Sequence, residues 1–195
     1  MSAAKHFAQE EKQGLPFVLE LLITLALALA LSLVARRFVV ESYEIPSGSM
    51  LETIQIGDRL IGEKVSYRFG SPQPGDIVTF NYVDPDTGAD ETLIKRVVAV
   101  GGQTVDLVGG VVYVDGVALD EPYTRGLPSN SLSDVAGSAG ISYPYVVPEG
   151  TIWVMGDNRT NSRDSRYFGP VDEDEVTSRA LFIFWPFSDA CWLAQ

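Results

Sequence analysis

The hydrophobic positions divide the chain into one long apolar run and a series of short segments. The run covers residues 15–35 and contains a single charged side chain, Glu20. A helix rises about 1.5 Å per residue, so a run of this length crosses a hydrocarbon layer of about 30 Å. We therefore predict a short N-terminal tail over residues 1–14 and one transmembrane helix over residues 15–35.

A cleaved secretory signal is the alternative interpretation of this run. Ala26, Ala28 and Ala30 have the small-x-small spacing of a signal cleavage site, and two lysines precede them. The run is longer than the apolar part of a usual signal, however, and it ends in Arg36 and Arg37. These features favour a retained anchor. Basic residues flank the run on both sides, so the positive-inside rule gives no orientation.

Residues 36–195 alternate short apolar segments with Gly, Pro and Asp, and they show no long amphipathic helix. This pattern predicts one all-β domain, an antiparallel sheet that is folded over or barrel-like. The strongest hairpin signal is Asp115-Gly116 between two apolar segments. Strands are expected over residues 59–65, 76–82, 93–100, 104–107, 111–114, 117–119, 151–155 and 179–184.

Three further segments have a local interpretation. Residues 120–148 are rich in Ser, Gly and Pro and predict a flexible surface insertion. Residues 84–91 are acidic, but their spacing departs from that of a calcium loop, so we interpret them as a hairpin loop. The aromatic run over residues 182–187, with Trp192, fits a core strand better than an aromatic belt at a membrane interface.

Charge and composition exclude several classes of function. The formal net charge is −12 at pH 7, and all of the acidic excess follows Arg37. A surface of this sign repels phosphates, so nucleic acid is not expected as a partner. The only histidine is His6 and the only cysteine is Cys191. A Ser-His-Asp triad, a Cys-His pair and the usual His/Cys zinc sites are therefore excluded within one chain, and no metal or cofactor is expected.

A candidate nucleophile follows the apolar run. In Pro46-Ser47-Gly48-Ser49 the proline fixes the backbone and the glycine permits a sharp bend. Such a bend would present Ser49 on an exposed corner. The same residue types are common in ordinary turns, so this segment needs a base elsewhere in the chain before it indicates catalysis.

Lysine is the neutral base that remains, and only Lys64 and Lys95 follow the apolar run. Lys95 precedes Arg96 in a predicted strand, where neighbours point to opposite faces. At least one of the two is therefore expected to be partly desolvated, and burial lowers the pKa of a lysine toward neutral pH. The alternative is a lysine that lies along the sheet with its amine in water.

A third segment, residues 156–169, follows a predicted strand and mixes acids, arginines, amides and hydroxyls. Groups this dense can satisfy one another in a rigid loop that orients catalytic side chains. The three segments together resemble the signature motifs of bacterial type I signal peptidases, the leader peptidases with a serine/lysine dyad. The matching motifs stand in the family's order behind an N-terminal anchor: Pro46-Ser47-Gly48-Ser49-Met50, Ile94-Lys95-Arg96 and Gly156-Asp157-Asn158-Arg159, continuing to Tyr167.

The resemblance covers about residues 43–170 apart from the predicted insertion, and it implies a set of roles. Ser49 is implied as the nucleophile and neutral Lys95 as its general base. The backbone N–H of Ser49 and the hydroxyl of Ser47 would form the oxyanion hole. Ser162 of the polar loop would orient the lysine amine. Asp164 and Arg166 would pair and so hold the loop in place.

The substrate implied by the resemblance is an exported preprotein that is cut after a small-x-small (Ala-x-Ala) motif. It would lie extended between two strands and contact Tyr43, Ile45, Pro46, Leu93 and Ile94. Such cleavage takes place on the outer side of the cytoplasmic membrane. The expected arrangement is therefore a single-pass protein in that lipid bilayer, with its catalytic domain, residues 36–195, outside.

One residue departs from the family pattern. The family usually has proline two residues after the methionine of the first motif, whereas this chain has Glu52. The change removes a conformational restraint, and a carboxylate within about 6 Å of the lysine would raise its pKa.

Two alternatives to a general signal peptidase remain open. A specialised Ser/Lys protease with one dedicated substrate has the same motifs, and a catalytically inactive membrane-anchored binding module would keep the fold. A self-cleaving repressor shares the chemistry, but a membrane span stands here in place of its DNA-binding module.

Overall fold

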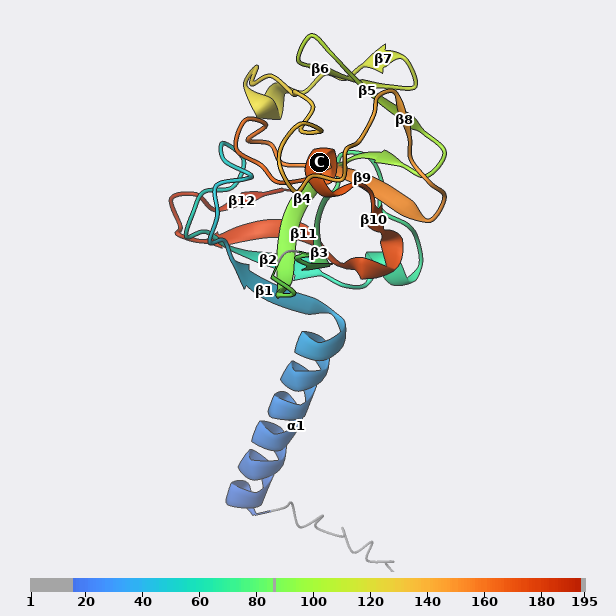
Figure 1. Ribbon diagram of the computed structural model, residues 1–195. Helices are drawn as coiled ribbons and strands as arrows, with labels where there is room; N and C mark the ends of the chain where they lie inside the picture. The colour runs from blue at the N-terminus through green and yellow to red at the C-terminus, as the bar shows by residue number, and fades with distance from the viewer. Residues whose placement is uncertain (1–15, 86, 194–195) are drawn as a thin grey trace, which may run out of the picture.

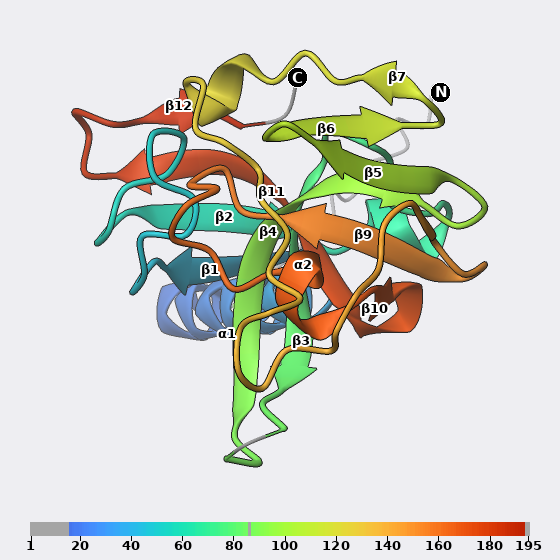
Figure 2. The same cartoon turned by 45° about the horizontal axis from the view of Figure 1, so that its top comes forward.

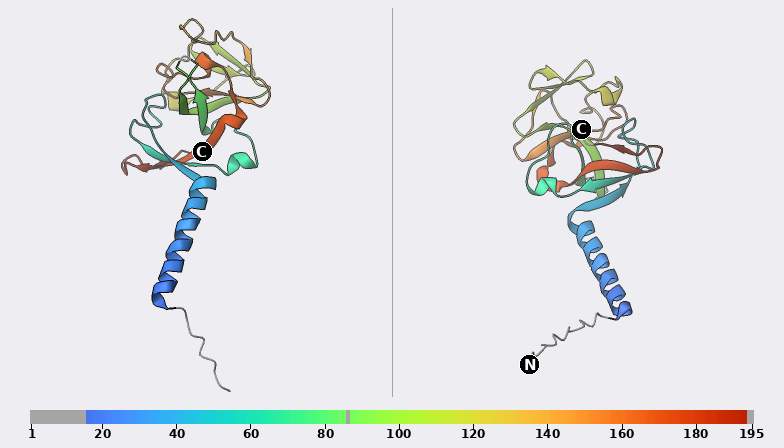
Figure 3. Two further views of the ribbon diagram at one scale, coloured as in Figure 1. Left: turned by 60° about the horizontal axis from the view of Figure 1, so that its bottom comes forward. Right: turned by 180° about the vertical axis from the view of Figure 1, so that it is seen from behind.

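The computed structural model describes residues 16–85 and 87–193, so the predicted tail over residues 1–14 lies outside the described residues. Helix α1, Phe17–Phe38, extends away from a β domain and buries none of its residues (Figures 1 and 3). Within the described part of the chain it is the one helix long and apolar enough to cross a membrane. The helix begins and ends slightly later than the apolar run predicted.

Two antiparallel sheets make up the domain. The larger sheet has the order β1-β2-β11-β3-β4-β9-β10, with β12 beside β11, and the smaller has the order β7-β6-β5-β8. The larger sheet consists of β1 (Val40–Glu44), β2 (Arg59–Glu63), β3 (Ile77–Val83), β4 (Asp90–Val100), β9 (Thr151–Met155), β10 (Val171–Asp172), β11 (Val176–Trp185) and β12 (Cys191–Trp192). The smaller consists of β5 (Thr104–Val108), β6 (Val111–Val114), β7 (Val117–Ala118) and β8 (Tyr145–Val146).

Four short helices complete the domain. They are the 3-10 helices η1 (Ser66–Arg68), η2 (Pro122–Thr124) and η3 (Glu173–Glu175), and one turn of α-helix, α2 (Ser165–Phe168). None of them was predicted, because a single helical turn has too few residues to show a helical period.

Every predicted strand is present, so the prediction of an antiparallel β domain behind one apolar helix is confirmed. Strands β1, β8, β10 and β12 were not predicted. The last three are two residues long, too short to show alternation. Strand β1 contains two glutamates and lies at the edge of the sheet, so its sequence lacks the apolar alternation of a half-buried strand.

Two predicted hairpins are also confirmed. Asp115 and Gly116 both have positive φ, 53° and 79°, as the tight turn between β6 and β7 requires. The acidic residues between β3 and β4 form the loop of the second hairpin, in which Val83 pairs with Asp90. Asp86, at the tip of that loop, lies outside the described residues.

Apolar side chains next to the site motifs belong to the core. Met50 and Ile54, which follow Ser49, are completely buried in one cluster. Burial of each such side chain stabilises the fold by about 1.5–3 kcal/mol, so the turn that carries Ser49 is firmly anchored. A second cluster surrounds Trp153 of β9, the strand that leads into the polar loop at Gly156.

The region predicted as a surface insertion, residues 120–148, makes specific contacts with the domain. Figure 2 shows it running from β7 past β4 and α2. Thr124 and Ser129 are buried, and Tyr143 packs against Trp153 of the core. The Tyr167 hydroxyl of α2 donates a hydrogen bond to a carbonyl oxygen in this region at 3.0 Å. Its flexibility stays a prediction.

The aromatic run at the end of the chain contributes less to the core than its sequence suggested. In β11 only Ile183 of this run is buried, whereas Trp185, Phe187 and Trp192 are largely exposed. Strand β11 lies between β2 and β3, but β3 pairs with it only as far as Arg179, and beyond that point the two-residue strand β12 takes its place. The expected strand is confirmed for residues 182–185, whereas the expectation that most of the run lies in the core was wrong.

Candidate active site

Ser49 lies in the turn that follows β1. The N–H of Ile45 donates to the Asp58 carbonyl oxygen at 2.9 Å, and the N–H of Gly57 donates to the Ile45 carbonyl oxygen at 2.8 Å. These bonds hold the end of β1 against the start of β2. Ser49 itself is only 8% exposed. The serine is thus not on the exposed corner that the motif suggested, because β4 and the polar loop close over it.

Lys95 of β4 contacts this serine directly. Its Nζ donates hydrogen bonds to Ser49 Oγ and to the Ile94 carbonyl oxygen, both at 2.9 Å. The lysine is 3% exposed. Burial lowers the pKa of Lys95 to about 8, although the nearby Asp164 carboxylate acts in the opposite direction. A substantial fraction of the amine is therefore neutral at mildly alkaline pH.

Arg96, the next residue of β4, is buried as well, on the opposite face of the strand. Its Nε and Nη2 donate to the two carboxylate oxygens of Asp157 at 2.9 and 2.7 Å. The guanidinium also lies over the ring of Tyr123, 4.0 Å from the ring centroid. The alternation of side chains along the strand predicted that at least one of Lys95 and Arg96 would be desolvated. Both are buried, because Asp157 compensates the charge of Arg96.

The predicted brace of the polar loop consists of Asp164 and Arg166, which are both buried. The guanidinium of Arg166 donates two hydrogen bonds to the Asp164 carboxylate, at 2.9 and 2.8 Å, and the backbone N–H groups of Arg166 and Gly156 donate two more, at 3.2 and 3.0 Å. Burial alone would raise the pKa of Asp164, but Arg166 and these bonds lower it below its usual range. Asp164 is therefore a fixed negative charge beside Lys95.

Ser162 lies close to the Ser49 turn but does not contact Lys95 through a hydrogen bond. Its Oγ is buried near the Asp164 carboxylate, outside hydrogen-bond geometry, and has no partner among the described residues. A Cβ atom at Gly156 would collide with this Oγ and with the carbonyl oxygen of Ser49. The role of Ser162 in orienting the amine stays a prediction.

Asn158 joins the polar loop to the Ser49 turn, a role that was not predicted from the sequence. Its Nδ2 donates to the Gly48 carbonyl oxygen at 2.8 Å, and its N–H donates to the Ser49 carbonyl oxygen at 3.0 Å. The side-chain hydrogen bond thus joins two residues that are 110 positions apart in the sequence. A local sequence pattern could not have revealed this contact, because the residues around Asn158 carry no information about a partner so far away in the chain.

A second group of contacts that sequence reasoning missed comes from residues 121–130. Arg159 of the polar loop is completely buried; it donates to Glu121 at 2.6 Å and to Ser129 Oγ at 2.6 Å. Arg166 donates to the carbonyl oxygen of Asn130 at 3.3 Å. The 121–130 segment therefore holds the outer side of the polar loop.

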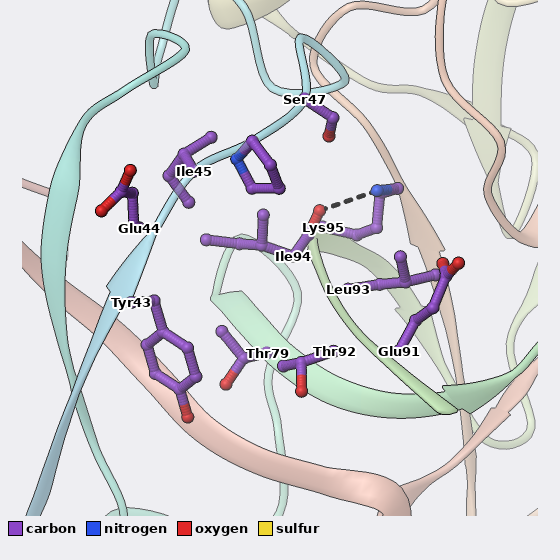
Figure 4. A pocket seen from close by; sticks show the side chains of 11 residues that line it. Tyr43, Glu44, Ile45, Ser47, Thr79, Glu91, Thr92, Leu93, Ile94 and Lys95 are labelled. Atoms are coloured by element: carbon purple, nitrogen blue, oxygen red, sulfur yellow. Dashed lines mark hydrogen bonds between the residues drawn. The ribbon is translucent and has the colours of Figure 1, made fainter. Parts of the chain in front are cut away.

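A cavity of about 390 Å³ opens beside Lys95 (Figure 4). Every residue predicted to bind substrate lines it: Tyr43, Ile45 and Pro46 on one side, Leu93 and Ile94 on the other. Ser47 lines it too, with an exposed side chain. Strands β2, β11 and β3 separate β1 from β4 in the sheet, so the sheet is folded over to bring both to one cavity.

Glu52 points away from this site. Its backbone has a positive φ of 76°, and its carboxylate pairs with Arg125 at 3.0 Å. Proline cannot adopt that φ, so the turn here differs from one that the family's proline would impose. The pKa of Lys95 follows from burial and Asp164, with no contribution from Glu52.

Comparison with known proteins gives consistent matches. The family model described as "Signal peptidase, peptidase S26" matches residues 18–185. Probable signal peptidase I-1 of Synechocystis sp. is 43% identical over 178 residues, which are 88% of this chain and 85% of that protein. Signal peptidase I of Leptolyngbya laminosa is 37% identical over 187 residues, 94% and 87% of the two chains.

Among solved structures, a signal peptidase I from Enterococcus faecalis is similar, with 32% identity and a TM-score of 0.43. The match covers 56% of this chain and 97% of that chain. The family model and the sequence relatives each extend over most of the sequence, including all three motifs. The chain belongs to the type I signal peptidases, a family of serine endopeptidases.

Proposed function

We propose that this protein removes signal peptides from exported preproteins, with Ser49 as nucleophile and Lys95 as general base. The observation that carries the proposal is the 2.9 Å contact between a buried lysine amine and a buried serine hydroxyl at the end of a cavity. No histidine exists in the described residues to serve as an alternative base. The relatives named signal peptidase I agree with this assignment.

In the first half of the reaction, the neutral Lys95 amine accepts the proton of Ser49 Oγ–H as the oxygen attacks the scissile carbonyl carbon. The resulting ammonium then gives this proton to the leaving amine as the C–N bond breaks. An acyl ester remains on Ser49. The hydrogen bond from Lys95 to the Ile94 carbonyl oxygen fixes the amine in the direction of the serine.

In the second half, Lys95 accepts a proton from a water molecule that attacks the ester, and it returns that proton to Ser49 Oγ as the acid product leaves. Both tetrahedral intermediates carry an oxyanion. We assign its stabilisation to the N–H of Ser49 and the hydroxyl of Ser47, which lines the cavity. One such donor contributes about 3–4 kcal/mol in other serine proteases.

The preprotein would bind as an extended strand between the end of β1 and the exposed start of β4. The backbone groups of these two segments would supply hydrogen bonds, and the part of the cavity between Ile45 and Ile94 would accept small side chains. A small-x-small motif before the scissile bond meets both requirements.

Helix α1 would anchor the enzyme in the cytoplasmic membrane, with the domain on the outer side, where preproteins emerge. The support for this arrangement is a helix that is exposed along its whole length and directly precedes β1. Anchoring keeps the cavity near the bilayer from which the substrate's own apolar segment projects.

The test is cleavage of a preprotein with an Ala-x-Ala site by the full-length protein in detergent. We expect cleavage after the second alanine, and a loss of at least about 10³-fold in kcat for Ser49→Ala and for Lys95→Ala. Folded Lys95→Ala protein that cleaves as fast as wild type would contradict the assignment. An inactive wild type that also fails to react with a serine-acylating inhibitor at Ser49 would favour a binding module.

A further inference from the structure

A second cavity, of about 270 Å³, opens on the other side of the Ser49–Lys95 pair. It shares Ser47, Glu91, Leu93 and Lys95 with the cavity described above. Its remaining walls come from the Ser49 turn, β3 and the polar loop: Gly48, Ser49, Tyr82, Asn161 and Arg163.

The second cavity meets one face of β4, whereas the first is lined by residues from both faces. The second cavity takes alternate residues of the strand, Glu91, Leu93 and Lys95, and omits those between them. In Figure 4, Thr92 and Ile94 lie on the side of Tyr43, whereas Leu93 and Glu91 point the other way. This is the arrangement that the two-residue period of a strand requires.

An extended substrate beside β4 has the same period. Side chains at the first and third positions before the scissile bond point to one face, and those at the second and fourth point to the other. The small residues of the small-x-small motif would occupy the cavity at Ile94. The residue between them then faces the second cavity, which we call the Glu91 cavity.

The charges of the Glu91 cavity are unequal. Arg163 pairs with Asp84 at 2.7 Å and stacks on the ring of Tyr167, 4.4 Å from its centroid. Glu91 is exposed and forms no ion pair or hydrogen bond among those found in residues 16–85 and 87–193. The arginine's charge is thus compensated, and the carboxylate of Glu91 gives the cavity a negative potential.

We propose that the residue between the two small residues of the cleavage motif enters the Glu91 cavity, and that Glu91 selects cationic over acidic side chains there. The inference rests on the proposed function. Leu93 and Glu91 are two strand residues apart, about 6.6 Å, which a lysine or arginine side chain spans. Aspartate or glutamate at this position would face a like charge.

The test uses three preproteins that differ only at this position, with Lys, Gln or Glu. We measure kcat/KM with the full-length enzyme at low ionic strength and mildly alkaline pH. Attraction and repulsion at an exposed site predict a preference of about 3–10-fold for Lys over Glu, which decreases in high salt. Glu91→Gln should bring the ratio near one, and Glu91→Lys should reverse it.

Asp90→Asn is the matched control, because Asp90 is an exposed carboxylate one residue away that lines neither cavity. This variant should retain the wild-type ratio. Equal cleavage of the three substrates by wild type, or a ratio that persists in Glu91→Gln, would overturn the inference while leaving the proposed function intact. Failure to cleave any of the three would overturn both.

Discussion

At Lys95 two opposing effects determine the pKa. Burial disfavours the ammonium, whereas the Asp164 carboxylate favours it, and burial is the larger effect. The lysine could be chosen from the sequence by elimination, since few other bases follow the apolar run. The effect of the Asp164 carboxylate on Lys95 could not be predicted from the sequence, because only the fold places residue 164 beside β4.

At Gly156 the polar loop leaves no room for a side chain beside the Ser49 turn. In Gly156→Ala, the new methyl group meets Ser162 Oγ and the Ser49 carbonyl oxygen and forces the two segments apart. We expect a loss of about 1–3 kcal/mol in the free energy of unfolding, together with a large loss of kcat. Urea denaturation and preprotein cleavage measure the two effects.

Gly70→Ala is the control for this substitution. Its added Cβ would have no neighbour closer than 3.8 Å. Stability and cleavage should therefore be preserved. If Gly156→Ala behaves like Gly70→Ala, the close approach described here is wrong.

Glu52 replaces the family's proline in a turn whose φ excludes proline. Glu52→Pro should lower the free energy of unfolding by more than about 1 kcal/mol, because the ring cannot adopt a positive φ. Glu52→Gly loses an exposed ion pair of about 0–1 kcal/mol but relieves backbone strain of similar size. Its stability, measured by urea denaturation, should stay within about 1 kcal/mol of wild type.

The activity–pH midpoint of Glu52→Gly should also be unchanged, because this carboxylate does not contribute to the pKa of Lys95. A midpoint that shifts to lower pH in this variant would show that Glu52 acts on the lysine after all.

At the scale of elements, the 121–130 segment stabilises the polar loop through a buried ion pair. Glu121→Ala would leave the guanidinium of Arg159 buried without a carboxylate. Removal of one partner of a buried pair costs about 3–5 kcal/mol of stability. The exposed pair of Arg59 with Glu44 gives the comparison, since Glu44→Ala should cost less than about 1 kcal/mol.

Denaturation of both variants by urea, followed by tryptophan fluorescence, gives the two values. Equal small losses would mean that the 121–130 segment covers the polar loop without supporting it. The Arg166 brace would then hold the loop alone.

The predictability of these elements follows their length and their partners. Strands with several alternating residues, such as β3 and β9, were found from sequence because the alternation is local. Strand β1 was missed because it lies at the sheet edge and its two glutamates interrupt the apolar alternation. The contacts of Asn158 and Glu121 depend on partners 110 and 38 positions away, and no sequence period reports such distances.

At the scale of the whole molecule, the proposed anchoring by α1 places the domain on the outer side of the membrane. Cys191 is the only cysteine and is exposed on β12, so it is a native probe of this orientation. A membrane-impermeant maleimide should label it in intact spheroplasts if the domain lies outside. Cys191→Ser should remain unlabelled.

A cysteine placed before α1, Ser2→Cys in the Cys191→Ser background, should react only after lysis. The opposite pattern, with Cys191 protected until lysis, would contradict the proposed orientation. The charge distribution alone could not decide this point, because basic residues stand at both ends of the apolar run.

The overall architecture was accessible from the sequence because one apolar helix and many short strands leave few alternatives. The sequence predicted that the sheet is folded over, but it did not predict the order of the strands. The consequence of this folding, a single cavity between β1 and β4, depends on three intervening strands and their twist.

The most direct test of the central claim is the dependence of kcat/KM for preprotein cleavage on pH, from about 6 to 10. The base must be deprotonated, and burial lowers the pKa of Lys95 to about 8. We predict that kcat/KM rises about tenfold per unit at low pH and levels off above the midpoint, with the same profile in Cys191→Ser. An acid optimum, or a profile that persists in Lys95→Ala, would contradict the serine/lysine mechanism.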